Sequence, residues 1–314
     1  MAQLGLIGLG HMGHGIARNL ALRGHRLRYL DHPGNRPADE IISLGGQACA
    51  TARDVARGAD AVILCVTGSP QVEAVLTGPE GVIAGLAPGA VVVDCSTALP
   101  DSTLRMWSLV ARAGARYLDA PMTRTAREAH EGRLNLLVGG DGAVLDRMRA
   151  VLGCFAENIR HVGPLGSGHR MKLLHNFVSV GFLSLLSEAA AQATDAGIAP
   201  ETLVEVLAAG GGAGVALDRI TPFLTRGDRG AMPFSIANAA KDLDYHLQMS
   251  AEAGAEDRIA QGIAAVLQGA AASDGDRTLP ELARMLRRSD PATAQHQGQD
   301  DAGHGAAQMR LPRD

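Results

Sequence analysis

The sequence predicts an α/β fold in which an N-terminal doubly wound parallel sheet is followed by an all-α C-terminal domain, with a long helix joining the two. Three observations support this. Short apolar runs with strand character alternate with helical stretches through the first half of the chain. A glycine-rich turn follows the first run, and helical periodicity dominates after the segment 163–168. A chain of 314 residues also has the length of two domains.

The first domain, residues 1–165, is defined by short strand-like runs that alternate with helical stretches. These runs are residues 4–7, 27–30, 61–66, 90–94, 116–118, 134–138 and 159–162. Helical stretches between them are residues 15–23, 102–113 and 143–152. Such an alternation is typical of a parallel sheet with helices packed on its faces.

The second domain, residues 166–290, is expected to be helical. A long Leu- and Ala-rich helix is predicted over residues 169–196, and Gly197 ends it. Further helices are expected from Pro200 and at residues 237–253, 257–268 and 279–288, and the glycines of residues 210–214 mark a loop. Residues 291–314 are polar and lack apolar periodicity, which predicts a disordered tail.

Composition excludes several classes of partner. The net charge is −4, and Lys and Arg are scattered along the chain, so no basic surface for nucleic acid is expected. The four cysteines form no CxxC pair, and we expect reduced, mostly buried thiols in a cytoplasmic protein. The eleven histidines form neither an HExxH motif nor a Cys/His cluster, so we predict no metal site.

No membrane partner is expected either. The N-terminus has no cationic region ahead of its apolar run, as a signal peptide would. The most apolar helical segment, residues 173–187, contains His175 and Asn176 and stops at Glu188, short of the roughly 18 apolar residues of a membrane span.

The most informative motif lies at the start of the chain, where the run 4–7 leads into Gly8-Leu9-Gly10-His11-Met12-Gly13. The three glycines permit a tight turn, a close approach of the backbone to a pyrophosphate, and close packing of helix on strand. Asp31 ends the second run, near the spacing of about 20 residues at which a carboxylate binds the adenosine ribose. These residues predict a Rossmann domain that binds NAD. Arg36 keeps NADP as the less favoured alternative, because a guanidinium suits a 2′-phosphate.

Four segments together resemble the β-hydroxyacid dehydrogenase family, which includes 3-hydroxyisobutyrate dehydrogenases, tartronate semialdehyde reductases and sulfolactaldehyde reductases. The segments are Gly8 to Leu20, Asp119-Ala-Pro-Met-Thr-Arg-Thr125, Gly166-Ser-Gly-His-Arg-Met-Lys-Leu-Leu-His-Asn176 and Lys241-Asp242-Leu243. The resemblance spans about residues 1–290. It implies an NAD(P)-dependent oxidoreductase that acts on CH–OH groups of small anionic substrates.

The third segment carries the chemistry that the resemblance implies. Lys172 and Asn176 are four residues apart, so they share one face of a helix. A lysine in a dry cleft is suited to move the proton of the reacting oxygen, and the Asn176 amide orients the same group. The alternative for Lys172 is a side chain that extends to solvent. For His175, beside Asn176, we favour a packing role.

The substrate loop departs from the family pattern. Thr123-Arg124-Thr125 stands where the family usually has Ser-Gly-Gly, and sulfolactaldehyde reductases have the most similar version of this loop. Thr123 retains a hydroxyl, and Arg124 adds a guanidinium that suits a sulfonate, a phosphonate or a second carboxylate. The alternative is that Arg124 extends into solvent.

Other segments of the resemblance imply contacts to the cofactor. Val66-Thr67 follows one strand-like run, and Ser96-Thr97 resembles an Asp-x-Ser-Thr motif near the nicotinamide. Lys241 corresponds to a second lysine near substrate and cofactor. The alternatives are simple capping at the strand ends, and an ordinary surface ion pair for Lys241.

The predicted function is hydride transfer between NAD and a small anionic 3-hydroxy acid or semialdehyde, with Lys172 as proton donor and acceptor. The alternatives are an imine reductase of the same fold, which commonly lacks this lysine, and a non-catalytic NAD(P)-binding module. The long apolar helix also predicts a homodimer or homotetramer, because such a surface is too apolar to be solvated.

Overall fold

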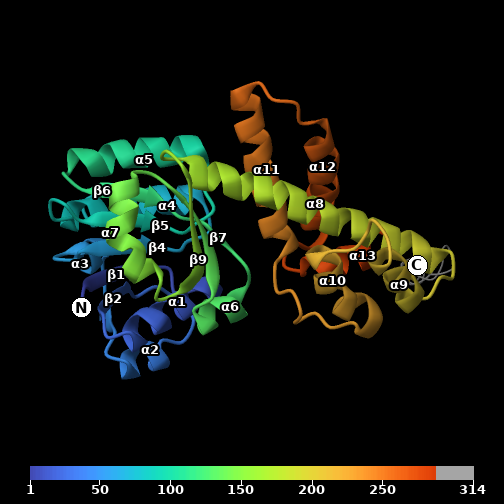
Figure 1. Ribbon diagram of the computed structural model, residues 1–314, viewed down its shortest axis with the longest axis horizontal. Coiled ribbons are helices and arrows are strands. Elements are labelled where there is room, and N and C mark those ends of the chain that lie inside the picture. Colours follow the sequence, from blue (N-terminus) through green and yellow to red (C-terminus); the bar gives the residue numbers. More distant parts are fainter. Residues whose placement is uncertain (288–314) are drawn as a thin grey trace, which may run out of the picture. The chain divides into compact units, whose positions relative to one another are not determined.

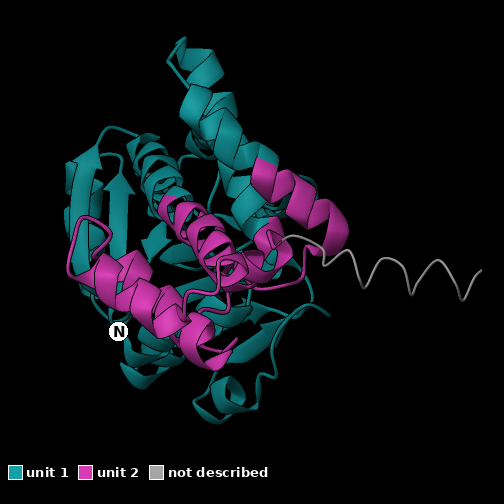
Figure 2. Cartoon of the chain, turned by 90° about the vertical axis from the view of Figure 1, so that its right-hand side faces the viewer, with its two compact units in different colours: residues 1–181, 238–265 teal, residues 182–237, 266–314 magenta. Residues whose placement is uncertain are grey.

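The computed structural model describes residues 1–287, so the tail expected at residues 291–314 lies outside the described part of the chain. The chain forms two compact units (Figure 2). The first comprises Met1–Gly181 and Asn238–Ala265. The second comprises Phe182–Ala237 and Val266–Asp314, described up to residue 287.

The first unit contains a nine-stranded sheet in the order β3-β2-β1-β4-β5-β6-β8-β7, with β9 paired to β8 (Figure 1). Its strands are β1 (Gln3–Ile7), β2 (Arg26–Leu30), β3 (Gln47–Cys49), β4 (Ala61–Leu64), β5 (Val91–Asp94), β6 (Arg116–Asp119), β7 (Met122–Thr123), β8 (Leu134–Gly139) and β9 (Ala156–Gly163). Strands β1 to β6 are parallel in the order 3-2-1-4-5-6, which is the doubly wound order. The predicted fold class is confirmed.

The sheet is mixed beyond β6, which the alternation of strands and helices did not predict. Strand β8 runs antiparallel to β6 and β7, whereas β9 runs parallel to β8. Only Ala120 and Pro121 separate β6 from β7, and both strands pair with β8, at Gly139 and at residues 135–136 respectively. The substrate loop therefore lies on a short strand at an irregular edge.

Two apolar layers hold helices against the two faces of the sheet. Leu6, Ile63 and Val93 pack with α1 (His11–Leu22) and α7 (Gly142–Leu152). On the opposite face, Leu64 and Val92 pack with α3 (Ala52–Ala56), α4 (Ser69–Leu76) and α5 (Pro100–Arg112). Burial on both faces explains why these strands are continuous apolar runs. Short elements complete this part: α2 (Asp39–Ser43), η1 (Val82–Gly85) and α6 (Ala126–Glu131).

The rest of the described chain is mostly helical. Its elements are α8 (Ser167–Asp195), α9 (Pro200–Ala208), α10 (Val215–Arg226), α11 (Ile236–Ala253), α12 (Arg258–Asp274), η2 (Leu279–Glu281) and α13 (Leu282–Met285). In the second unit, Ala190 of α8, Phe223 of α10 and Ala283 of α13 form a small core. Where the sequence predicts a last helix at 279–288, the described residues, up to 287, contain a 3-10 turn followed by a short helix. Ser235 and Thr278 form an isolated β-bridge nearby.

The expected division at residues 165 and 166 remains a prediction. Strand structure ends at Gly163 and α8 begins at Ser167, but the compact units divide α8 after Gly181 and group residues 238–265 with the sheet. By length and composition α8 is able to cross a membrane, yet half of its most apolar window is buried in the protein. A core helix has the same properties, so this is weak evidence for a span.

A capping box starts α6, directly after the substrate loop. The Thr125 hydroxyl and backbone N–H donate to Glu128 Oε2 at 2.6 and 3.0 Å. Burial alone would raise the pKa of Glu128, but hydrogen bonds from Thr125 and Arg127 outweigh burial and lower it to about 2. Both donors of Thr125 are therefore used within the protein.

We expect this carboxylate to make stability depend on pH at acidic values. Because the folded pKa of Glu128 is depressed, its contribution is complete above its ordinary pKa of 4.5 and is lost as the pH falls toward 2. Glu128→Gln should lower the thermal unfolding midpoint at neutral pH and make its decline between pH 4.5 and 2 shallower, measured by circular dichroism. Glu252→Gln, at an exposed position, is the control. Identical profiles for wild type and Glu128→Gln would contradict this expectation.

Candidate active site

The glycine loop between β1 and α1 has the geometry that dinucleotide binding requires. Gly8 has φ of +99°, and a Cβ there would lie 2.2 Å from the carbonyl oxygen of Cys65. A Cβ on Gly13 would lie 1.8 Å from the carbonyl oxygen of Gly8. A Cβ on Gly10, in contrast, would meet no protein atom within 4 Å. The loop is therefore closed toward the sheet at Gly8 and Gly13 and open at Gly10, where a pyrophosphate fits.

The other residues of this motif divide between the core and the surface. Leu9 is fully buried and belongs to the core, and half-buried Met12 packs against it. His11 is exposed at the first position of α1.

The loop after β2 is attached to the glycine loop. Asp31 is exposed at the end of β2, where the sequence predicts a ribose ligand. The side chain of Asn35 accepts the N–H of Leu9 at 3.3 Å and donates to the carbonyl of Leu30 at 2.9 Å. The N–H of Arg36 donates to the carbonyl of Leu9 at 2.9 Å. Asp31 and Arg36 are thus on one loop whose position Asn35 fixes, a role that sequence reasoning missed.

The carboxyl ends of β4 and β5 are linked by a serine. Ser96 Oγ accepts the N–H of Val66 at 3.1 Å, and the Ser96 N–H donates to Asp94 Oδ1 at 2.9 Å. Thr67 and Thr97, the two predicted cofactor contacts beside this link, are exposed and half-buried. Ligands of doubly wound sheets bind at these strand ends.

Helix α11 contacts the same edge. Lys241 Nζ donates to the carbonyl of Thr67 at 2.8 Å and lies 5.0 Å from the ring centroid of Tyr245. The Tyr245 hydroxyl accepts the N–H of Ser69 at 3.2 Å, and it leaves no room for a side chain at Gly68. Lys241 therefore lies beside the predicted cofactor contacts. Tyr245 was not identified from the sequence, where a tyrosine four residues after Lys241 carries no distinctive signal.

A buried pair joins α8 to α11. Asn176 Nδ2 donates to Asp242 Oδ2 at 2.6 Å, and both side chains are almost inaccessible to solvent. The other carboxylate oxygen of Asp242 forms an ion pair with Lys241 Nζ at 2.8 Å. His175 Nδ1 lies 3.0 Å from Asn176 Oδ1, and since an amide oxygen only accepts, the proton is on this nitrogen. Half-buried Lys172 lies one helical turn before Asn176.

The two lysines of this site are the only lysines of the chain. Lys and Arg total 29, so the other 27 cationic positions are arginines. Arginine remains protonated at any physiological pH, whereas lysine can release its proton. A chain that otherwise uses arginine has lysine only at the two positions where the family resemblance places function.

The substrate loop makes its contacts with β8 and β9. Thr123 Oγ1 accepts a hydrogen bond from the Asn135 amide at 3.1 Å. Arg124 has φ of +81°, a left-handed conformation that favours glycine, and its guanidinium binds Glu157 and the carbonyl of Arg133. The hydrogen bond from Arg124 lowers the pKa of Glu157. Arg124 therefore does not extend freely into solvent, and it preserves the backbone shape of the glycine that it replaces.

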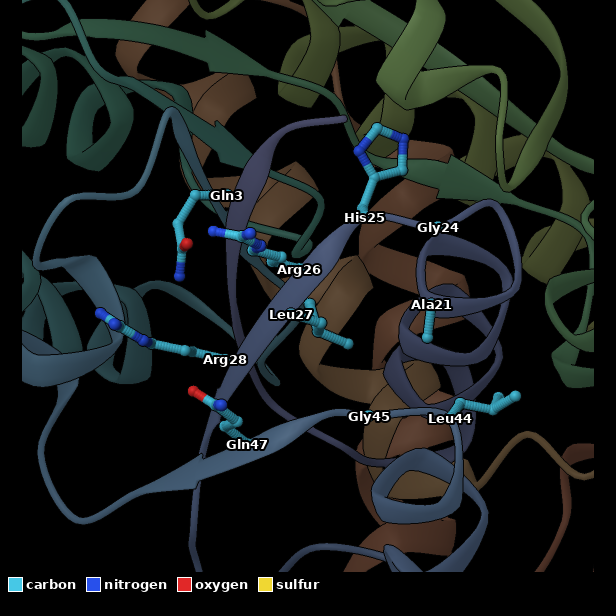
Figure 3. Close-up of a pocket in the computed structure, with 10 residues that line it drawn as sticks. All are labelled: Gln3, Ala21, Gly24, His25, Arg26, Leu27, Arg28, Leu44, Gly45 and Gln47. Carbon is cyan, nitrogen blue, oxygen red and sulfur yellow. The ribbon is translucent and has the colours of Figure 1, made fainter.

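One cavity lies away from these residues. It has a volume of about 470 Å³ and is lined by Gln3, Arg26 and their neighbours at the amino ends of β1 and β2 (Figure 3). The glycine loop follows the carboxyl end of β1, so this cavity is at the wrong end of the strands for a dinucleotide. Within residues 1–287, no group of three or more His, Cys, Asp or Glu residues is arranged to hold a metal.

Comparisons with known proteins match both halves of the described chain. A family model described as the NAD binding domain of 6-phosphogluconate dehydrogenase matches residues 3–163. A second, described as the NAD-binding domain of NADP-dependent 3-hydroxyisobutyrate dehydrogenase, matches residues 166–286. The 2-(hydroxymethyl)glutarate dehydrogenase of Eubacterium barkeri is 32% identical over 251 residues, which are 80% of this chain and 83% of that protein.

Two further relatives cover most of the chain. The NAD-dependent L-serine dehydrogenase of Pseudomonas aeruginosa is 31% identical over 288 residues, 92% of each chain. The structure of Mycobacterium tuberculosis 3-hydroxyisobutyrate dehydrogenase with L-serine superimposes with a TM-score of 0.82 at 26% identity, covering 92% of this chain and 100% of that one. The chain therefore belongs to the β-hydroxyacid dehydrogenase family, and it is an oxidoreductase of CH–OH groups with NAD as cofactor.

Proposed function

We propose that this protein oxidises a small anionic 3-hydroxy acid to its semialdehyde, or reduces the semialdehyde, with Lys172 as the proton donor and acceptor. The observation that carries this proposal is the buried Asn176–Asp242 pair, which ties α8, one turn after Lys172, to Lys241 on α11. It brings residues from two distant segments of the family motif into one hydrogen-bonded array.

Lys172 is suited to the proton transfer that accompanies loss of a hydride from carbon. When bound, NAD accepts or returns the hydride. The alcohol oxygen then has to lose or gain a proton, and an ammonium group also stabilises the negative charge that develops on this oxygen. Lysine serves here where arginine does not, because arginine cannot act as a base.

Asn176 is held so that it presents one donor to the substrate. Its oxygen faces His175, and one of its two N–H bonds is directed at Asp242. We assign the remaining N–H to the reacting oxygen. An amide fixed at both ends orients its donor before substrate binds, which lowers the cost of reorganisation during the reaction.

Thr123 and Arg124 are the proposed ligands of the anion. The compounds in the names of the three relatives, 2-(hydroxymethyl)glutarate, L-serine and 3-hydroxyisobutyrate, all contain a 3-hydroxypropanoate unit. On carbon 2 they carry a propanoate chain, an amino group and a methyl group, respectively. We assign the common carboxylate to the Thr123 hydroxyl. Thr125, whose two donors bind Glu128, holds the end of the loop and is not itself a ligand. We propose that Arg124 binds a second anionic group of the substrate. To do so, its guanidinium leaves the half-exposed carboxylate of Glu157.

The cofactor is proposed to lie along residues 8–13, with Asp31 on the adenosine ribose and Val66, Thr67, Thr97 and Lys241 toward the nicotinamide. The open space beside Gly10 supports this arrangement. An exposed carboxylate at Asp31 repels a 2′-phosphate and favours NAD over NADP.

We also propose a cytoplasmic homodimer or homotetramer that assembles through helical surfaces. Met171, Leu174 and Val178 are exposed at spacings of three and four residues on α8, so they form an apolar stripe.

Gly10→Ala should separate cofactor binding from folding. The backbone at Gly10, with φ of −75° and ψ of −160°, suits alanine, and a Cβ meets no protein atom, so the variant should fold. It should bind NADH at least about tenfold more weakly by fluorescence titration, because the methyl group occupies the pyrophosphate position. Gly262→Ala, at another open position, is the control. Unchanged NADH affinity in Gly10→Ala would refute the placement.

Lys172→Ala should bind NADH normally but lose about 10²- to 10⁴-fold in kcat, the usual contribution of general acid–base catalysis. Lys172→Arg should be similarly inactive, because it retains the charge but not the ability to release a proton. Steady-state reduction of semialdehydes measures the effect. Wild-type turnover by Lys172→Ala would rule out the mechanism, and turnover of cyclic imines but not semialdehydes would indicate an imine reductase.

The role of Arg124 is tested with substrates that differ in their anionic groups. Tartronate, methylmalonate and succinic semialdehydes carry one carboxylate, 3-sulfolactaldehyde carries one sulfonate instead, and 2-(hydroxymethyl)glutarate carries a second carboxylate. Arg124→Ala should reduce kcat/KM about tenfold for the substrate whose second anion it binds. Glu157→Gln should increase kcat/KM for that same substrate, because it removes the competing carboxylate. If Arg124→Ala leaves all five kcat/KM values unchanged, Arg124 does not bind the substrate.

A further inference from the structure

Three polar side chains lie side by side across three adjacent strands next to the substrate loop. Thr123 of β7 is opposite Asn135 of β8 in the antiparallel pair, and Asn135 is opposite Asn158 of β9 in the parallel pair. Asn158 Nδ2 donates to Asn135 Oδ1 at 2.9 Å, and Asn135 Nδ2 donates to Thr123 Oγ1 at 3.1 Å. The result is a directed chain of hydrogen bonds that begins at the exposed side of β9 and ends at the Thr123 hydroxyl.

The direction of this chain decides what Thr123 offers to a ligand. A primary amide donates at one end and accepts at the other, so each asparagine transmits the direction to the next group. In the observed direction the Thr123 oxygen accepts from Asn135, and the hydroxyl hydrogen can be donated to an anion. In the reverse direction Thr123 would donate to Asn135 and present only lone pairs, which repel a carboxylate.

We propose that Asn135 and Asn158 are positioning residues for substrate binding, because together they direct the hydroxyl hydrogen of Thr123 toward the substrate carboxylate. This inference rests on the proposed role of Thr123 as a ligand of that carboxylate. Neither asparagine needs to touch the substrate.

Further contacts beside the polar side chains join the same three strands, whose register the backbone pairing sets. Arg124, directly after Thr123, binds Glu157, directly before Asn158, and also the carbonyl of Arg133 on the segment that leads into β8. These contacts join β7, β8 and β9 next to the polar chain. Asn158 is exposed, so substitutions there should leave the fold intact.

Asn158→Asp tests the direction of these hydrogen bonds, because Asn158 is the first donor in the series that ends at Thr123. A carboxylate only accepts, so Asn135 should turn its N–H groups toward position 158 and its oxygen toward Thr123, which would then donate inward. The KM for the best semialdehyde of the panel above should increase about three- to tenfold, with kcat unchanged within about twofold. Asn158→Lys, which can only donate, should leave KM within about twofold of the wild-type value.

Thr123→Val separates the role of Thr123 as a ligand from the positioning role of Asn135 and Asn158. Alone, it should raise KM about tenfold, as expected for a lost hydrogen bond to a charged group. In the Thr123→Val background, Asn158→Asp should have no further effect, whereas direct repulsion between the added charge and the substrate would persist.

The outcomes are separable. If Thr123→Val leaves KM unchanged, Thr123 does not bind the carboxylate, and both its proposed role and this inference fail. If Thr123→Val raises KM but Asn158→Asp has no effect, or acts equally in both backgrounds, the positioning role is wrong and the role of Thr123 stands.

Discussion

The carboxylate of Asp119, fully buried at the end of β6, accepts the backbone N–H groups of Gly166 and His169 at 2.9 and 2.8 Å. Burial raises the pKa of Asp119, and His169 and these two N–H groups oppose that rise. Space is so limited here that a Cβ on Gly168 would lie 2.5 Å from the carbonyl oxygen of Leu137. The start of α8 is thus fixed against the sheet. Every proposed catalytic group on α8 depends on this contact, because a rigid helix transmits its starting position to Lys172 and Asn176.

His169 joins this junction to the cofactor edge. Its ring is fully buried, with Nε2 3.2 Å from the carbonyl oxygen of Ser96 and Nδ1 2.7 Å from the hydroxyl of Thr103. Since a carbonyl only accepts, Nε2 carries a proton. The imidazole therefore bridges the strand end beside Thr97 and the first turn of α8. Buried polar contacts thus connect the proposed cofactor residues at the strand ends to the start of the helix that carries Lys172 and Asn176.

The sequence predicts those parts of the structure that depend on residues close together in the chain. The glycine loop was predictable because its glycines are required by close backbone contacts within the loop and its neighbouring strands. The central strands were predictable because burial on both faces makes them apolar. Strands such as β3 and β7 are too short to show the alternation of apolar and polar residues that marks a strand. The antiparallel direction of β8 is also not indicated by the types of its residues. The resemblance identified Asn176 and Lys241, but the Asp242 contact that unites them crosses 66 positions of sequence and emerged only from the fold.

Arg124 shows why a residue's chemistry and its backbone have to be considered together. A guanidinium in a substrate loop suggested an anion ligand, yet this position also needs the left-handed conformation of a glycine, which costs other residues about 1–2 kcal/mol. The contacts with Glu157 and Arg133 hold the loop in this shape. The scarcity of lysine has a practical consequence for chemical labelling. Besides the N-terminus, an amine-selective reagent finds only Lys172 and Lys241, so the primary amines of this enzyme are nearly confined to the proposed active site, and covalent labelling would report on its occupancy if that proposal is correct.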